Sequence, residues 1–382
     1  MAAETPLELF AACLPGVEPY LAKELCELSL VPKPLFQTGE GGVSLTGSME
    51  TIYRSNLWLR TANRILLRLG KFHALKFVEL RRKAGNLPWE RYLSPGQPVS
   101  IRTTCKHSKL YHSGGVTERV LGAIGDRLGR LPEINEFAED QPSAQLVVVR
   151  FDHDECTISV DTSGEGLHRR GYRLGLAKAP LRETLAAALL SAAGWDRKSP
   201  LLDPFCGSGV IPIEAALIAS HTAPGINRRF AFMDWPGFAS QAFEEEKKAA
   251  AGARHLPSAV ILGSDRDAGA ILTARQNAER AGVADWVQFS QAAISAINPP
   301  RGPGWVVTNP PYGVRISASN DLRSLYAQFG NVLKKQCPGW TTAFLCNDDH
   351  LASLTRLKFE KGVSLNNGGI PVKLSIGKVL PE

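Results

Sequence analysis

The chain has 382 residues, 44% of them hydrophobic and 21% charged, which is typical of a globular protein of two or three domains. Its seven cysteines are irregularly spaced and contain no C-x-x-C pair, which argues against a disulfide framework and against a zinc ribbon. No apolar run approaches the about 20 residues of a membrane span, and the net charge of +7 favours an anionic partner. We expect a monomeric, cytoplasmic protein that makes no contact with membranes.

The first 48 residues predict a small α/β unit, with strands at 9–13 and 43–45 and a helix at 17–28. Beyond Ser48 the spacing of apolar residues predicts a helix that continues as far as Leu69. On such a helix, side chains four residues apart share a face. The helix would therefore carry a basic stripe made of Arg60, Arg64 and Arg68.

Basic residues remain frequent further along, at Arg81, Arg82, Lys83, Lys106 and Lys109. Each alone is an ordinary solvated charge, but together with the arginine stripe they predict a surface that faces RNA. A strand at 99–101, a helix at 116–128 and strands at 146–151 and 156–161 complete this half of the chain.

A segment rich in glycine, arginine and histidine follows from residue 162 to 179 and predicts a linker, so we place a domain boundary near residue 165. Its residues His168, Arg169 and Arg170 either are solvated or contact RNA phosphate.

The C-terminal half alternates between predicted helices and strands. Helices are expected at 181–193, 210–220 and 268–281, and strands at 200–202, 259–262, 287–289, 305–307 and 342–345. This alternation predicts an α/β domain with a mostly parallel, doubly wound sheet, which binds ligands beyond the carboxyl ends of its strands. The segment 221–257, an excursion between a helix and a strand, interleaves basic and aromatic residues: Arg228, Arg229, Phe230, Phe232 and Trp235. This excursion either lines an RNA channel or packs on itself.

The segment Asp203–Gly209 connects a predicted strand to a predicted helix, where Gly207 and Gly209 would let the backbone approach a ligand closely. Val210-Ile211 excludes a phosphate-binding P-loop, and Pro212 stands where a dinucleotide site needs a third glycine. Of the three kinds of ligand that such a loop could bind, S-adenosylmethionine remains, because its sulfonium and amino-acid tail suit the carboxylate of Asp203. The alternative is a glycine-rich turn with no ligand.

Asp265 ends the second predicted strand of this domain, where a carboxylate can accept hydrogen bonds from ribose hydroxyls. Asp267 competes for this role, but its position before a predicted helix favours a cap.

The tetrapeptide Asn309-Pro310-Pro311-Tyr312 follows the fourth predicted strand. The side-chain oxygen of Asn309 and the carbonyl of Pro310 can accept both protons of a planar amino group, while the prolines hold these acceptors in place. The ring of Tyr312 offers a face on which a base can stack. The alternative is an ordinary proline turn.

These motifs together resemble a known family. Asp203–Gly209, Gly263–Asp267 and Asn309–Gly313 resemble the motifs of class I methyltransferases that act on exocyclic amino groups. The stretches Lys178–Thr184 and Asn366–Gly369, together with the basic N-terminal region, narrow the resemblance to bacterial THUMP-containing guanine-N2 RNA methyltransferases.

The resemblance implies a ferredoxin-like unit at 1–48, a THUMP RNA-binding domain at 49–162, a linker at 163–180 and a Rossmann-like methyltransferase domain at 181–382. It implies methylation of guanine N2 in 23S rRNA, with tRNA as the alternative substrate, and no metal. It implies catalytic roles for Asn309, Pro310 and Tyr312. It also implies that S-adenosylmethionine is bound by Asp203, Phe205, Gly207, Gly209, Asp265, Arg266 and Asn309.

One position departs from the family pattern. The third strand of such domains usually ends in an aspartate that contacts the adenine amino group, and here Ala293 stands in its place. Adenine recognition would then depend on backbone groups or on Gln291, and cofactor affinity would be weaker. The other functions that remain open are N6-adenine methylation, methylation of protein glutamine and RNA binding without catalysis.

Overall fold

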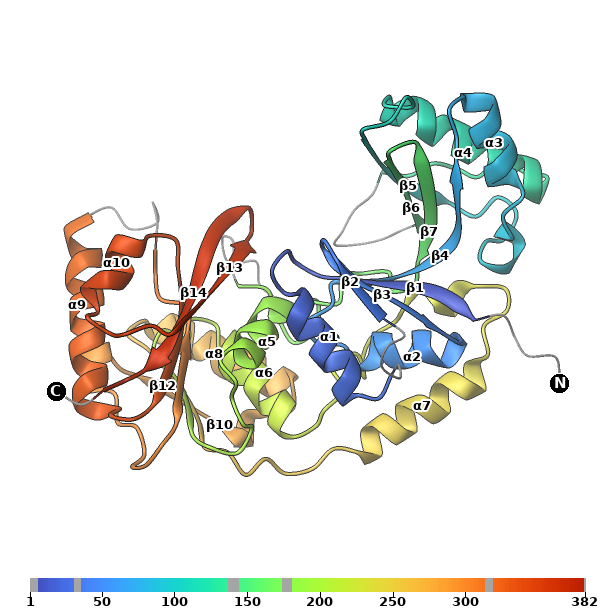
Figure 1. The fold of residues 1–382 in the computed structure, drawn as a ribbon. Helices are drawn as coiled ribbons and strands as arrows, with labels where there is room; N and C mark the ends of the chain where they lie inside the picture. The colour runs from blue at the N-terminus through green and yellow to red at the C-terminus, as the bar shows by residue number, and fades with distance from the viewer. Residues whose placement is uncertain (1–5, 31–35, 137–143, 174–180, 313–318, 381–382) are drawn as a thin grey trace. The chain divides into compact units, whose positions relative to one another are not determined.

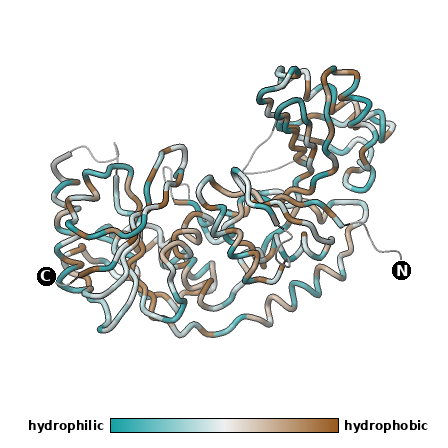
Figure 2. The backbone as a smooth tube through the Cα atoms, viewed as in Figure 1, coloured by the Kyte–Doolittle hydropathy of each residue, from teal (hydrophilic) through white to brown (hydrophobic). Residues whose placement is uncertain are grey.

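The computed structural model describes residues 6–30, 36–136, 144–173, 181–312 and 319–380 (Figure 1). The chain forms two compact units. The first contains residues 1–13, 24–167 and 228–249, and the second contains residues 14–23, 168–227 and 250–382. Within each unit the hydrophobic stretches of the chain gather along the inner strands and helices (Figure 2). Among the described residues, no helix combines the length and the apolar character that a membrane crossing requires.

The first unit is built on one seven-stranded sheet with the order β2-β3-β1-β4-β7-β6-β5. Neighbouring strands are antiparallel except for β5 and β6, which run parallel. The strands are β1 (Leu7–Ala12), β2 (Phe36–Gly39), β3 (Gly42–Gly47), β4 (Arg64–His73), β5 (Val99–Lys106), β6 (Gln145–Asp152) and β7 (Glu155–Asp161). The helices are α1 (Glu18–Glu27), which the two units share, α2 (Met49–Trp58), α3 (Phe77–Gly85) and α4 (Ser113–Leu128).

The long helix predicted after Ser48 is wrong beyond Trp58. Leu59 adopts an extended conformation that ends α2, and residues 64–73 form strand β4 between β1 and β7. Ile65 and Leu67 are buried while the alternate residues are less so, which is the period of a strand. Pairing with strands distant in sequence therefore overrides the local helical spacing, and the three arginines form no helical stripe.

The excursion after residue 220 packs with the first unit through its aromatic side chains. Phe230, Phe232 and Trp235 are buried, as is Phe243 of helix α7 (Ser240–Gly252). The rings of Phe232 and Phe243 lie 4.9 and 5.5 Å from the ring of Tyr53. These aromatic residues are core residues, so they do not offer stacking faces to RNA.

The second unit contains a seven-stranded sheet with the order β10-β9-β8-β11-β12-β14-β13. The first five strands are parallel, and β14 and β13 are antiparallel to their neighbours, which confirms the mostly parallel, doubly wound sheet. The strands are β8 (Leu201–Asp203), β9 (Ile261–Asp265), β10 (Val287–Gln291), β11 (Trp305–Thr308), β12 (Thr341–Cys346), β13 (Lys361–Asn367) and β14 (Ile370–Lys378). The helices are α5 (Glu183–Ala192), α6 (Val210–Ala219), α8 (Ala268–Arg280), α9 (Ser319–Gln336) and α10 (Asp349–Leu354).

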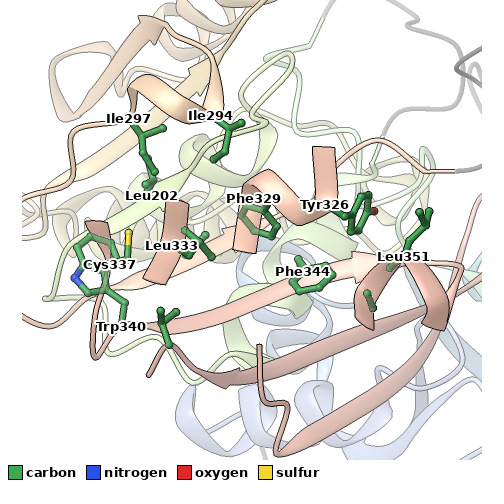
Figure 3. Packing of buried hydrophobic residues seen from close by; sticks show 14 of the residues in the cluster. Leu202, Ile294, Ile297, Tyr326, Phe329, Leu333, Cys337, Trp340, Phe344 and Leu351 are labelled. Atoms are coloured by element: carbon green, nitrogen blue, oxygen red, sulfur yellow. The ribbon is translucent and has the colours of Figure 1, made fainter. Parts of the chain in front are cut away.

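Helices cover both faces of this sheet, with α5 and α6 on one side and α9 and α10 on the other (Figure 1). On the α9 side, Tyr326 and Phe329 pack against Phe344 of β12, with ring centroids 6.2 and 5.5 Å apart (Figure 3). Leu333 and Trp340 extend the same buried cluster. This core fixes α9 beside the carboxyl ends of the strands, where its first turns contribute to the site.

Candidate active site

The carboxyl ends of the parallel strands bring the predicted motifs to one edge of the second unit's sheet. In the strand register, Asp203 of β8 lies beside Gly263 of β9, and Gln291 of β10 lies beside Asp265. Strand β11 lies on the other side of β8 and leads directly into Asn309. The three segments that the sequence singled out therefore meet at one place.

Asp203 is buried at this edge and is held by two hydrogen bonds. Its Oδ1 accepts from the hydroxyl of Thr308 at 2.6 Å and from the backbone N–H of Phe205 at 3.1 Å. Burial raises the pKa of Asp203 to about 7, because the two hydrogen bonds offset only part of the cost of burying the charge. Thr308 therefore links the end of β11 to the loop after β8.

The glycines of this loop are required by the backbone and by packing. Gly207 and Gly209 have φ of 51° and 84°, which a residue with a side chain adopts at a cost. A Cβ on Gly209 would lie 2.9 Å from atoms of Ala274 and Phe289, so no larger residue fits there. The N–H of Gly207 donates to Asp265 Oδ2 at 3.0 Å.

Asp265 organises the loops around it. Its second oxygen, Oδ1, accepts from the N–H of Asp267 at 3.0 Å. Asp267 in turn accepts from Gly269 and Ala270 and caps α8, as its position before the helix predicted. A ribose role for Asp265 stays a prediction, and one of its lone pairs is already used by Gly207.

A cavity of about 660 Å³ opens at the same edge. It is lined by Pro204 and Phe205 of the first loop, by Asp265–Asp267, by Ala292–Ile294, by Asn309–Tyr312, and by Leu322, Ser324, Leu325 and Gln328 of α9. Its size lies within the 300–1,000 Å³ that is common for small-molecule sites. Among the described residues, Asp203, Gly207 and Gly209 do not belong to this lining.

Asn309 offers the clearest ligand-facing group of the cavity. Its Oδ1 is buried and has no hydrogen-bond partner among the described residues. A buried acceptor without a donor costs about 1–3 kcal/mol, so native structures usually provide a partner. A ligand that donates an N–H at this place would supply it.

The rest of the tetrapeptide is held by α9, the next helix along the chain, and by the more distant hairpin of β13 and β14. The hydroxyl of Tyr326 on α9 donates to the carbonyl of Pro311 at 3.3 Å. Asn367, at the turn between β13 and β14, donates from Nδ2 to the hydroxyl of Tyr312 at 2.7 Å, and both residues are buried. The carbonyl of Pro310 stays a predicted acceptor.

The departure at Ala293 falls on the cavity wall, two residues after the end of β10. Gln291, the predicted substitute, is exposed and donates from Nε2 to the carbonyl of Arg266 at 3.3 Å. It does not belong to the described lining, so adenine recognition by Gln291 receives no support from its position. Arg266 itself lines the cavity, as a cofactor-binding residue would.

Of the residues predicted to bind RNA, five have interaction partners within the protein and three others are exposed. Arg64 pairs with the buried Asp161 at 2.6 Å, Arg81 makes two hydrogen bonds to Asp126, and Lys83 bonds Glu79 at 2.7 Å. The guanidinium of Arg68 lies 5.1 Å from the centre of the Phe10 ring, and Arg60 also has partners. The exposed remainder is Arg82, Lys106 and Lys109.

Part of the predicted linker, from residue 168, belongs to the second unit and contains buried residues. Arg170 is 7% exposed, and its Nε lies 3.6 Å from Oε1 of the fully buried Glu214. Tyr172 donates to the same carboxylate at 3.1 Å. Arg170 is therefore neither a solvated residue nor an RNA contact. Residues 174–180, which include the start of the Lys178–Thr184 stretch, lie outside the described residues, as does Gly313.

Sequence reasoning missed Thr308, Tyr326 and the wall that α9 contributes. For α9 a signal was present, because Leu322, Tyr326, Phe329 and Leu333 recur at helical spacing. For Thr308 no local pattern exists, because its partner Asp203 is 105 residues away.

The order of this sheet, its antiparallel final pair and the Asn-Pro-Pro-Tyr segment after the fourth strand define the class I methyltransferase fold. The chain matches three family models: the RlmL ferredoxin-like domain at 8–66, the THUMP domain at 75–161, and the RMKL-like methyltransferase domain at 170–376. The chain therefore belongs to the THUMP-containing methyltransferases that share the RMKL-like domain, which confirms the resemblance found in the sequence. The domain boundaries expected at residues 48, 162 and 180 stay predictions.

Individual relatives match nearly the whole chain. The ribosomal RNA large subunit methyltransferase K/L of Syntrophotalea carbinolica is 36% identical over 97% of this chain and 53% of its own length. The chain thus spans about half the length of this relative. In Synechocystis sp., slr0064 is 35% identical over 96% of this chain and 95% of its own length, and its name proposes an RNA methyltransferase. The crystal structure of SMU.472 complexed with SAH is 30% identical, covers 100% of this chain and 99% of that one, and has a TM-score of 0.86.

Proposed function

We propose that this protein is an S-adenosylmethionine-dependent RNA methyltransferase that methylates the exocyclic N2 amino group of a guanine in 23S rRNA. The observation that carries the proposal is Asn309, whose buried Oδ1 lacks a partner on the wall of the cavity. An exocyclic amino group of a base has the two N–H donors that this site lacks.

The chain's own residues would orient the amino nitrogen. Its lone pair is delocalised into the ring, so the nitrogen is a weak nucleophile until its protons are held by acceptors. Asn309 Oδ1 and the Pro310 carbonyl would accept these protons and direct the lone pair into the cavity. Tyr312 would stack on the base, and Asn367 holds its hydroxyl.

S-adenosylmethionine would supply a methyl group already activated by a positive sulfur, so the transfer requires no metal. The site fits such a cofactor on two observations. The cavity has an adequate volume for the cofactor. The carboxyl groups of Asp203 and Asp265 lie at the ends of β8 and β9, at the same edge of the sheet. Asp265 would accept from the ribose, with Arg266 and Phe205 on the wall, while Asp203, Gly207 and Gly209 would shape the loop behind it. In SMU.472, of the same fold, SAH is bound.

The RNA would be held by the first unit. We assign phosphate contacts to the exposed residues Arg82, Lys106 and Lys109. Arg64, Arg81 and Lys83 already have carboxylate partners, and we assign them to the fold. The choice of large-subunit rRNA follows the name of the Syntrophotalea relative, of which this chain matches about half.

The test is methyl transfer by this chain itself to 23S rRNA and to tRNA, both taken from a strain that lacks the protein. Nucleoside mass spectrometry then identifies the methylated base. We expect N2-methylguanine in 23S rRNA. N2-methylguanine in tRNA would change the substrate, N6-methyladenine would change the base, and no transfer to any RNA would refute the enzymatic function.

Asn309→Ala provides the site-specific arm of this test. We expect it to lower kcat by about 100-fold while the affinity for S-adenosylmethionine changes little, because Asn309 is proposed to hold the amino group. Asn347→Ala is the matched control, since Asn347 is exposed in the same unit. Equal activity of the two variants would remove Asn309 from the mechanism.

A further inference from the structure

A second constellation of ligand-type side chains lies in the first unit, outside the methyltransferase domain. It consists of His107, Asp152 and His153, and each residue offers one ligand atom within 4.8 Å of the other two. His107 follows strand β5, and the other two lie at the end of β6 and in the turn to β7. Because β5 and β6 are parallel and Lys106 lies beside Asp152, both strands end at the same place.

The distances between the ligand atoms are close to those of a bound dication. Asp152 Oδ1 lies 2.9 Å from Nδ1 of His153 and 3.5 Å from Nδ1 of His107. Metal–ligand bonds of about 2.0–2.2 Å in a tetrahedron place neighbouring ligand atoms roughly 3.4 Å apart. The two imidazole rings already stack with centroids 4.9 Å apart. The ligand atoms of the two histidines lie within 4.8 Å of each other.

The backbone around the three residues is fixed in an uncommon conformation. Asp152 pairs with Glu155, so His153 and Asp154 form a two-residue hairpin turn, and their φ values are 49° and 63°. His107 also has a positive φ, of 45°. Such turns usually contain asparagine and glycine, and residues with a larger side chain adopt this conformation at a cost. Histidine and aspartate are, with asparagine, the non-glycine residues that adopt this conformation most often, so the turns can hold both imidazoles in place.

Hydrogen bonds hold the two loops against each other. The N–H of Lys109 donates to Asp154 Oδ1 at 2.6 Å, and the N–H of Asp154 donates to Ser108 Oγ at 2.9 Å. The carbonyl of Asp154 accepts from the N–H of Ala74 at 3.0 Å. His107 is therefore presented to the hairpin turn by a preformed backbone rather than by a chance approach of side chains.

From this geometry we propose that His107, Asp152 and His153 form a binding site for a first-row transition dication, best suited to Zn²⁺. Two imidazoles and one carboxylate are a preferred zinc ligand set, and three protein ligands leave a fourth position open. That position faces solvent, because both histidines are exposed, and water or an anionic oxygen such as a phosphate would fill it. The site is separate from methyl transfer and does not depend on the proposed function.

Charges of both signs surround this site. Asp154 and Glu155 add negative charge at the turn, although Glu155 is paired with Lys71 at 2.6 Å. Lys106 on β5 and Arg150 on β6 add positive charge on the neighbouring strands. With charges of both signs nearby, affinity would depend mainly on the two imidazoles and the Asp152 carboxylate.

The test uses the full chain, Zn²⁺ by calorimetry and Co²⁺ as a spectroscopic probe. We expect one equivalent to bind, with visible Co²⁺ bands and without the near-ultraviolet charge-transfer band of a thiolate ligand. His107→Asn and His153→Asn should each weaken binding at least about tenfold. Asparagine tolerates the left-handed backbone, so these variants keep the loop conformation.

His112→Asn is the matched control. His112 is another histidine of the same unit, and its Nδ1 caps α4 by accepting from the N–H of Gly115, a cap that asparagine can preserve. We expect its metal affinity to be unchanged. Zn²⁺ should also raise Tm for the wild type and for His112→Asn, but not for His107→Asn or His153→Asn. Absence of stoichiometric binding, equal affinity in all variants, or a thiolate band that persists in the variants would each overturn the proposal.

Discussion

The hydrogen bond between Asn367 and Tyr312 couples the last hairpin of the sheet to the proposed base-stacking residue. The bond is 2.7 Å long and buried at both ends. Replacing Asn367 with alanine would remove a buried donor and release the Tyr312 ring from the position that the hairpin sets. Losing such a partner costs about 1–3 kcal/mol, which corresponds to a factor of about 5 to 150 in rate if the cost falls on the transition state.

We expect Asn367→Ala to lower kcat for RNA methylation about tenfold with little change in the affinity for S-adenosylmethionine. The affinity should be preserved because Asn367 holds the base-stacking side of the cavity and does not belong to its described lining. Tyr312→Phe keeps the ring and loses only the hydroxyl, so its effect should be smaller. The assay is transfer of labelled methyl groups to 23S rRNA at a temperature well below Tm.

Asn366→Ala is the matched control, because the neighbouring Asn366 accepts from Gly369 within the turn and does not bond Tyr312. It should cost stability without lowering kcat. The double variant Asn367→Ala with Tyr312→Phe should be little worse than Asn367→Ala alone, with a coupling energy of about 1 kcal/mol. Fully additive losses, or an equal loss in Asn366→Ala, would refute the reasoning.

Three further outcomes are expected. Ala293→Asp should tighten cofactor binding about tenfold in a calorimetric titration by adding an acceptor for the adenine amino group, and an unchanged affinity would show that the absent carboxylate has no consequence. Because burial raises the pKa of Asp203 to about 7 from an unfolded value near 3.8, the folded state favours the protonated carboxyl. This preference adds to the free energy of unfolding below about pH 4. The contribution, about 4 kcal/mol, is lost as the pH rises from 4 to 7. When the free energy of unfolding in urea is measured between pH 4 and 7, Asp203→Asn should abolish this loss of stability. Parallel curves of stability against pH for the variant and the wild type would contradict the reasoning. Arg64→Ala should lower the free energy of unfolding by about 3–5 kcal/mol, since it leaves Asp161 charged and buried. Arg82→Ala should change it by less than about 0.5 kcal/mol, and similar losses in the two variants would argue against a structural role for Arg64.

Much of the second unit could be predicted because its signals are local. Strands β8, β11 and β12 contain short apolar runs, and the helices after β8 and β9 have starts marked by Gly209 and Asp267. The carboxyl ends of parallel strands must share an edge, so the sequence alone predicts that the motifs lie together. The prediction was less successful where a segment's partner lies far away in sequence.

Strand β4 illustrates that limit. Residues 64–73 carry a spacing compatible with a helix, and only pairing with β1 and β7 makes them a strand. The same pairing converts Arg64 from a predicted RNA contact into the partner of Asp161, 97 residues away. The excursion at 221–257 shows the same limit. Its aromatic residues belong to the core because they pack against Tyr53, which is distant in sequence.

By itself, then, the sequence determined the fold class, the family and the edge of the sheet where the proposed chemistry takes place. These depend on short motifs whose meaning is set by the nearest strand or helix. Only the tertiary structure decided which charges are paired, which residues support Asp203 and Tyr312, and that His107 meets Asp152 and His153. The contacts of Thr308 with Asp203, of Asn367 with Tyr312 and of His107 with Asp152 join residues 105, 55 and 45 positions apart, and no local spacing encodes them.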